Sequence, residues 1–125
     1  MRREPPRQRT LRSLRRRDRA EALNTLKEAE ATLVKIEAEI AEVARRVVSL
    51  SASLNSPPGE TSLTAGRLRM DALRLEHERN ELQRLTKREA TLSKDKRAAA
   101  ERLDEARDAA AKAVKALAVL ENKTD

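Results

Sequence analysis

Nine apolar residues recur in an uninterrupted heptad pattern between residues 26 and 54. One series repeats every seven residues, and a second series follows it by three residues. The nine positions are Leu26, Ala29, Leu33, Ile36, Ile40, Val43, Val47, Leu50 and Leu54. An average spacing of 3.5 residues aligns these side chains in one stripe along a helix, where they pack against a partner helix. The pattern therefore predicts a long helix that requires a helical partner.

We expect this partner to come from the same chain, because one short helix-breaking segment separates two helical patterns. Residues 55–60 read Asn-Ser-Pro-Pro-Gly-Glu. Two adjacent prolines remove two backbone donors, and glycine adopts the positive φ that other residues avoid. A break this short lets the second helix fold back along the first as an αα-hairpin.

The second helical pattern follows Thr61 or Ser62, either of which is a suitable N-cap. The best heptad frame places Leu68, Leu75, Leu82, Leu103, Ala110 and Leu117 at a, and Leu85, Leu92, Ala99, Ala106, Ala113 and Leu120 at d. Polar residues interrupt this frame at Asp71, Glu78, Glu89 and Lys96. The predicted fold class is all-α, with two long helices forming an antiparallel coiled-coil hairpin.

The expected organisation is one helical domain behind a basic tail. Residues 1–9 hold four Arg and two Pro and no large apolar residue after Met1, which predicts disorder. Helix 1 begins after Thr10 or at Asp18, since both are N-cap residues. The predicted segments are a tail over 1–9 and a single hairpin over 10–122, with helix 1 at about 11–54, a turn at 55–61 and helix 2 at about 62–122.

Folding about Pro58 predicts the register of the hairpin. It places Val47 near Met70 and Leu11 near Ala106. Residues 109–120 would then extend past the start of helix 1 with nothing in this chain to cover them. This segment is either a frayed end with high helix propensity or a partner-binding end, because an apolar surface left over by pairing usually marks an interface.

The composition favours a coiled coil over a compact globular core. The 125 residues are 38% hydrophobic and 39% charged, and they include no Phe, Tyr or Trp. Aromatic side chains supply the largest buried areas of compact cores, so Leu, Ala, Val and Ile alone suit a narrow two-helix seam. The chain contains no cysteine and no apolar run of membrane-spanning length. We expect a soluble, cytoplasmic protein.

No motif for catalysis, cofactor binding or metal binding is present. His77 is the only histidine, and no cysteine accompanies it, so a solvated or seam-edge histidine is favoured over a metal ligand. Asn80 is either a buried residue that fixes the register or an exposed one. The carboxylates alternate with basic residues along helix faces, which is typical of surface charge. We expect no enzyme activity and no cofactor.

The net charge of +7 is concentrated at the start of the chain. Residues 1–20 hold nine Arg against Glu4 and Asp18, and the remaining 19 basic and 19 acidic residues cancel. The densest group is Arg12, Arg15, Arg16, Arg17 and Arg19. Phosphates of nucleic acid and carboxylates of an acidic protein both attract such a cluster, and a merely solubilising role is the third alternative. The chain has no aromatic platforms on which bases could stack, which weakens the nucleic-acid alternative.

Residues 10–23 read Thr-Leu-Arg-Ser-Leu-Arg-Arg-Arg-Asp-Arg-Ala-Glu-Ala-Leu and continue into Ala-, Leu- and Glu-rich heptads. This run resembles the start of the FliJ/YscO/HrpO family of type III secretion proteins. The likeness also covers the basic start, the single long hairpin and the alanine-rich return helix. The chain is short for the family and lacks the aromatics that some flagellar members carry on their gate-binding face.

The resemblance implies a non-enzymatic central stalk of a bacterial type III secretion ATPase, in a flagellar or injectisome (virulence) system. Such a stalk promotes assembly and activity of the hexameric ATPase and links it to the export gate and to secretion chaperones, at the cytoplasmic side of the inner membrane. The expected partner-binding residues are Arg12, Arg15, Arg16, Arg17, Arg19, Val114, Leu117 and Leu120. The alternative is a basic-headed coiled coil that binds nucleic acid or acts as a scaffold.

Overall fold

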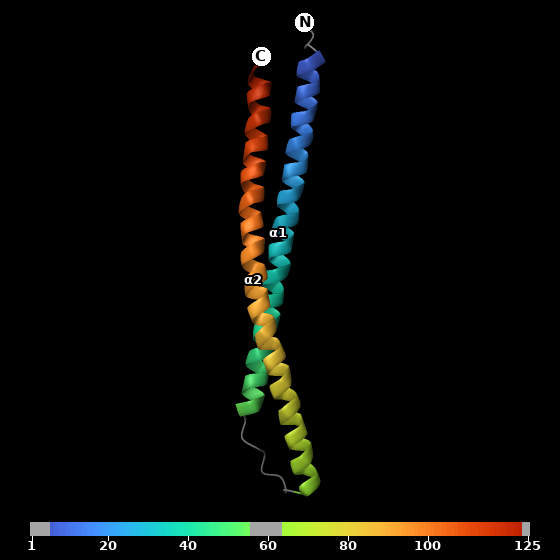
Figure 1. Cartoon of the computed structure of the whole chain (residues 1–125), viewed down its shortest axis with the longest axis vertical. Helices are drawn as coiled ribbons and strands as arrows, with labels where there is room; N and C mark the ends of the chain where they lie inside the picture. The colour runs from blue at the N-terminus through green and yellow to red at the C-terminus, as the bar shows by residue number, and fades with distance from the viewer. Residues whose placement is uncertain (1–5, 56–63, 124–125) are drawn as a thin grey trace. The chain divides into compact units, whose positions relative to one another are not determined.

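The computed structural model describes residues 6–55 and 64–123, and these form two helices. Helix α1 spans Pro6–Asn55 and helix α2 spans Ala65–Lys123. Figure 1 shows the two helices side by side and running in opposite directions. The predicted all-α antiparallel hairpin is therefore confirmed. The helix-breaking residues Pro57, Pro58 and Gly59 lie outside the described residues.

Helix α1 begins at Pro6, earlier than the expected start near residue 11. Proline is well placed at the first helical position, because its missing N–H has no helical partner there. The hydroxyl of Thr10 donates a hydrogen bond of 3.0 Å to the carbonyl oxygen of Pro6, so Thr10 lies inside the helix. Asp18, the other expected N-cap, also lies within the helix.

Helix α2 has an N-cap at Thr64. The Thr64 hydroxyl oxygen accepts a hydrogen bond from the backbone N–H of Arg67 at 3.3 Å, and its carbonyl accepts one from Leu68 at 3.0 Å. The caps predicted from the sequence, Thr61 and Ser62, lie outside the described residues. A threonine therefore caps this helix by the expected chemistry at a later position.

Contacts group the chain into two units, each containing part of both helices. The first unit comprises Met1–Lys35 and Arg97–Asp125, and the second comprises Ile36–Lys96. In the second unit, Val43 of α1 and Leu85 and Leu92 of α2 form a buried core. The partly buried residues packed against it are Ile36, Ile40, Val47 and Leu50.

In the first unit, the buried residues come from α2 and are mostly small. They are Ala99, Leu103, Ala106, Ala110 and Leu117. Every one of them, like Leu85 and Leu92 in the second unit, occupies a predicted a or d position. The heptad frame of α2 is thus the frame that the structure buries, and alanine at the seam lets the helix backbones approach closely.

The register differs from the one predicted by folding about Pro58. In the second unit, Arg46 bonds to Glu81 and Ser53 bonds to Glu78, where the predicted register placed residues 71 and 64. Helix α2 is therefore displaced by 10 to 14 residues from its predicted position. The predicted neighbours Val47 and Met70 do not pack together, since Met70 is 72% exposed. A slip by whole heptads keeps every a and d residue on the seam, so the apolar pattern does not determine it.

Because of this displacement, α1 covers the end of α2 and leaves the first turns of α2 uncovered. Figure 1 shows that the first turns of α2 extend past the end of α1 in the second unit, and Leu68, Met70 and Leu73 are exposed there. In the first unit, the segment 109–120 was expected to be uncovered. This prediction is wrong, because Ala110 is 5% exposed and Leu117 is 2% exposed.

Candidate functional site

The start of α1 and the end of α2 lie together in the first unit and form a strongly basic terminal end (Figure 1). We define this terminal end as residues 6–20 and 110–123. It contains seven Arg and Asp18 on α1, and three Lys and Glu121 on α2, which gives a net charge of +8. The antiparallel fold therefore adds the lysines of α2 to the arginine cluster of α1, a combination that the sequence analysis did not include.

Ion pairs along α1 hold two of the predicted arginines. Arg15 lies 3.8 Å from Asp18, and Arg17 lies 3.2 Å from Glu21. The side chains in both pairs are about half exposed or more, so solvent screens them and each pair contributes little to stability. Arg16 and Arg19 are exposed, whereas Arg12 is half-buried. Arg12, Arg15, Arg16 and Arg19 follow the i, i+3, i+4, i+7 spacing of one helix face, whereas Arg17 lies outside that face.

Three of these arginines continue the heptad frame of α1. Counting back from Leu26 and Ala29 by whole heptads assigns Arg12 and Arg19 to a and Arg15 to d. At the terminal end, the seam therefore presents cationic residues from α1 and apolar residues from α2. The sequence contains this signal, but it is found only when the heptad frame is extended from Leu26 toward the N-terminus.

The three apolar residues predicted to bind a partner differ in their exposure. Leu117 is buried at 2% exposure, so it belongs to the intrachain seam and the expectation that it lay uncovered is wrong, while its role as a partner contact stays a prediction. The register explains this, because α1 covers this part of α2. Val114 is 44% exposed, and Leu120 is half-buried. Val114 and Leu120 therefore stay candidates for contact with a partner.

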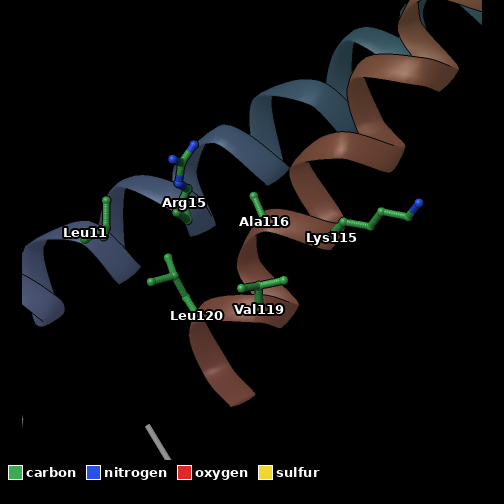
Figure 2. Close-up of a pocket in the computed structure, with 6 residues that line it drawn as sticks. All are labelled: Leu11, Arg15, Lys115, Ala116, Val119 and Leu120. Atoms are coloured by element: carbon green, nitrogen blue, oxygen red, sulfur yellow. The ribbon is translucent and has the colours of Figure 1, made fainter. Parts of the chain in front are cut away.

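A hollow of about 410 Å³ lies between the two helices at the terminal end. It is lined by Leu11, Arg15, Lys115, Ala116, Val119 and Leu120. Figure 2 shows Leu120 extending from α2 toward α1, while the charged tip of Lys115 points away from the apolar residues. Leu11, Ala116 and Val119 were not among the predicted site residues. They could have been found from the apolar character of Leu11 and of the end of α2, but only with the observed register, which brings the two together.

Outside the terminal end, the charged groups form surface pairs within the second unit. The Nε of Arg88 lies 3.2 Å from Glu39, and this hydrogen bond raises the pKa of Arg88. The hydrogen bond from Arg84 lowers the pKa of Glu81, and the charges of Arg84 and Arg46 act in the same direction. These pairs bridge or border the two helices, which is a structural role.

The described residues provide no cluster of metal-binding side chains. His77 and Asn80 are both exposed, in agreement with the solvated alternatives for each. Among the residues that the structure covers, neither helix has an apolar segment able to cross a membrane.

Comparison with family models, curated proteins and solved structures found no match. The likeness of residues 10–23 to the FliJ/YscO/HrpO family stays a prediction. The terminal end, with its concentrated charge and its apolar hollow, is the feature of the chain best suited to bind a partner.

Proposed function

We propose that this chain is the non-enzymatic central stalk of a bacterial type III secretion ATPase. In this proposal, the terminal end lies in the centre of the hexameric ring, at the cytoplasmic side of the inner membrane. The chain also links the ATPase to the export gate and to secretion chaperones, as the resemblance implies. The proposal rests on that resemblance together with the helical hairpin.

The observation that carries the proposal is the charge of +8 on a terminal end built from both helix ends. Arginine forms bidentate hydrogen bonds with carboxylates, so a ring whose central loops carry Asp and Glu would attract this end. A single hairpin presents different residues on its different sides. It would therefore contact six equivalent subunits unequally and bias which subunit adopts the catalytically competent state.

The proposed role in ring assembly follows from linkage. A stalk that binds the assembled ring more tightly than separate subunits shifts the equilibrium toward the ring. The interaction would be electrostatic in large part, so it should weaken as salt is added. Both effects are measurable with purified proteins.

The test is stimulation of ATP hydrolysis by the cognate secretion ATPase. Replacing Arg16 and Arg19 by Glu reverses two exposed charges of the terminal end and should abolish stimulation. The matched control replaces Arg69 and Arg74 by Glu, because these arginines are exposed on α2 in the second unit. The control should stimulate like the parent. Full stimulation by the Arg16→Glu, Arg19→Glu variant would refute the proposal.

The arginine cluster also supports a second candidate function, binding of nucleic acid by the terminal end. Seven Arg within residues 6–20 would neutralise several phosphates and release their counterions. Affinity for a generic duplex would then fall steeply with salt concentration. Tight binding that persists at physiological salt would favour this second function over the stalk.

A further inference from the structure

The hollow at the terminal end has an apolar floor that is open to solvent. Leu11 is 40% exposed and Val119 is 53% exposed, although both line the hollow together with Leu120. Leu11 also lines an adjoining hollow on α1 with Pro6, Thr10 and Leu14, and Leu14 is 49% exposed. Exposed apolar side chains that gather around a concave surface mark an interaction site more strongly than isolated ones do.

Cations border this apolar floor on both helices. Arg15 of α1 and Lys115 of α2 line the same hollow with their stems. The charged tip of Lys115 points away from the apolar floor (Figure 2), and the guanidinium of Arg15 lies 3.8 Å from Asp18. Their aliphatic stems can cover apolar atoms while their charged groups stay in water. The matching occupant therefore has an apolar centre with carboxylates on either side of it.

The charge of the terminal end excludes a second copy of this chain as the occupant. A second terminal end would bring another +8 to the same place, and like charges oppose such a contact. Nucleic acid fits the cations but not the floor, because phosphates against Leu11 and Val119 would lose hydration without gaining a donor. The chain also provides no aromatic ring for base stacking.

We propose that this hollow binds an acidic amphipathic helix of a partner protein. The walls of the hollow are two helices, and a third helix packs its apolar side chains into the groove between two others. An apolar residue of the partner helix inserts between Leu11 and Val119. Glutamates three or four residues away on that helix reach Arg15 and Lys115. This inference rests on the proposed function only for the identity of the partner, which would be an acidic helix of the secretion machinery.

The experiment uses the full chain and a synthetic helical peptide as probe. The peptide carries Leu at its a and d positions and Glu at e and g, with a fluorescent label, and binding is followed by fluorescence anisotropy. One control peptide replaces every Glu by Lys, and another replaces every Leu by Ser. The chain should bind the Glu peptide at least tenfold more tightly than either control. Equal binding of the Lys peptide would overturn the proposed charge complementarity.

Substitutions in the chain locate the site. Val119→Asp and, separately, Leu11→Asp should each lower the affinity for the Glu peptide about tenfold or more, because a carboxylate then occupies the apolar floor. The matched control is Val34→Asp, which makes the same change at a valine of the first unit that is 64% exposed and lies outside the hollow. It should bind like the parent. Circular dichroism checks that each variant stays helical.

The outcomes separate this inference from the stalk function. If neither Val119→Asp nor Leu11→Asp weakens peptide binding beyond the Val34→Asp control, the hollow is not the site, even if the chain stimulates the ATPase. If a DNA duplex displaces the peptide as efficiently as unlabelled peptide does, the terminal end is a general polyanion surface and the inference is also overturned. Peptide binding at the hollow without ATPase stimulation would refute the stalk and leave the helix-binding site in place.

Discussion

Ser53 of α1 donates hydrogen bonds to both carboxylate oxygens of Glu78 on α2, at 3.2 and 3.1 Å. Glu78 occupies a d position of α2, so a residue that seemed to interrupt the seam has a polar partner there. This pair lies close to the end of α1 at Asn55. The pair therefore identifies the register in the second unit. In this register, the first turns of α2 extend past the end of α1.

The first prediction tests this register by crosslinking. The chain has no native cysteine, so a Ser53→Cys, Glu78→Cys variant carries only the introduced pair. A short bifunctional maleimide should link these two cysteines within one chain under dilute conditions. The control pair, Val47→Cys with Met70→Cys, represents the register predicted from the sequence and should stay unlinked. Mass spectrometry of the monomer distinguishes the two results, and efficient linkage of the control pair would contradict the observed register.

The heptad pattern predicted the fold but not this register, for a physical reason. Apolar periodicity specifies which face of each helix is buried, and the burial of Val43, Leu85 and Leu92 agrees with it. A slip by two heptads keeps the same face buried, so only specific contacts such as Ser53 with Glu78 select one alignment. The observed start of α2 at Ala65 differs from the predicted start near residue 62 by only three residues, so the position of the N-cap does not account for the displacement of 10 to 14 residues.

The error in the predicted register also explains which residues of the candidate site were predicted and which were missed. The arginines of α1 were identified from their sequence density alone, which does not depend on the partner helix. Leu117 was expected to be uncovered because the predicted register placed it beyond α1, but it is buried. Leu11 and Val119 were missed because their hollow exists only when both helix ends are aligned. The buried face of each helix and the antiparallel pairing were thus predictable, whereas features that depend on the register of the two helices were not.

The second prediction concerns burial along α2. Leu92 is 1% exposed and packs in the core of the second unit, whereas Leu68 is 52% exposed. Leu92→Ala should lower the free energy of unfolding by about 2 to 4 kcal/mol, because it removes buried apolar atoms and leaves a cavity. Leu68→Ala, the same change in the same helix, should cost less than about 0.5 kcal/mol. Urea unfolding followed by circular dichroism measures both, and equal costs would mean that the first turns of α2 are covered in solution.

The third prediction concerns the pH dependence of stability. The hydrogen bond from Arg84, together with the positive charges of Arg84 and Arg46, lowers the pKa of Glu81 in the folded chain. A lowered folded-state pKa means that this contribution is present above the unfolded-state pKa and is lost as the pH falls through the folded-state value. Glu81→Gln should therefore lower the urea midpoint at neutral pH, and the difference should shrink as the pH falls below the ordinary glutamate pKa of about 4.3 and disappear only below the lowered folded-state pKa.

A second variant isolates the cause of this effect. If Arg84 supplies the main interaction, Glu81→Gln should have a smaller effect at neutral pH in an Arg84→Gln background than in the parent. Unfolding curves of the four proteins at several pH values provide this comparison. A difference between Glu81→Gln and the parent that does not change with pH would show that Glu81 acts through packing and not through its charge.

The last prediction concerns the arginines that occupy seam positions at the terminal end. Arg15 stands at a d position, opposite the apolar end of α2, and it lines the hollow with Leu120. Arg15→Leu would add one apolar residue to the seam face of α1, between Arg12 and Arg19, and should stabilise the hairpin by roughly 1 to 2 kcal/mol, because a leucine then packs at the seam. Arg16→Leu is the adjacent control, which removes the same charge at a position outside the stripe and should change stability by less than about 0.5 kcal/mol.

Arg15→Leu should also weaken binding of the acidic peptide, since it removes one of the two cations at the hollow. A chain that becomes more stable while it binds less well would indicate that the arginine is kept at the seam for its interaction with a partner, whereas a loss of stability on Arg15→Leu would contradict the seam assignment of this residue.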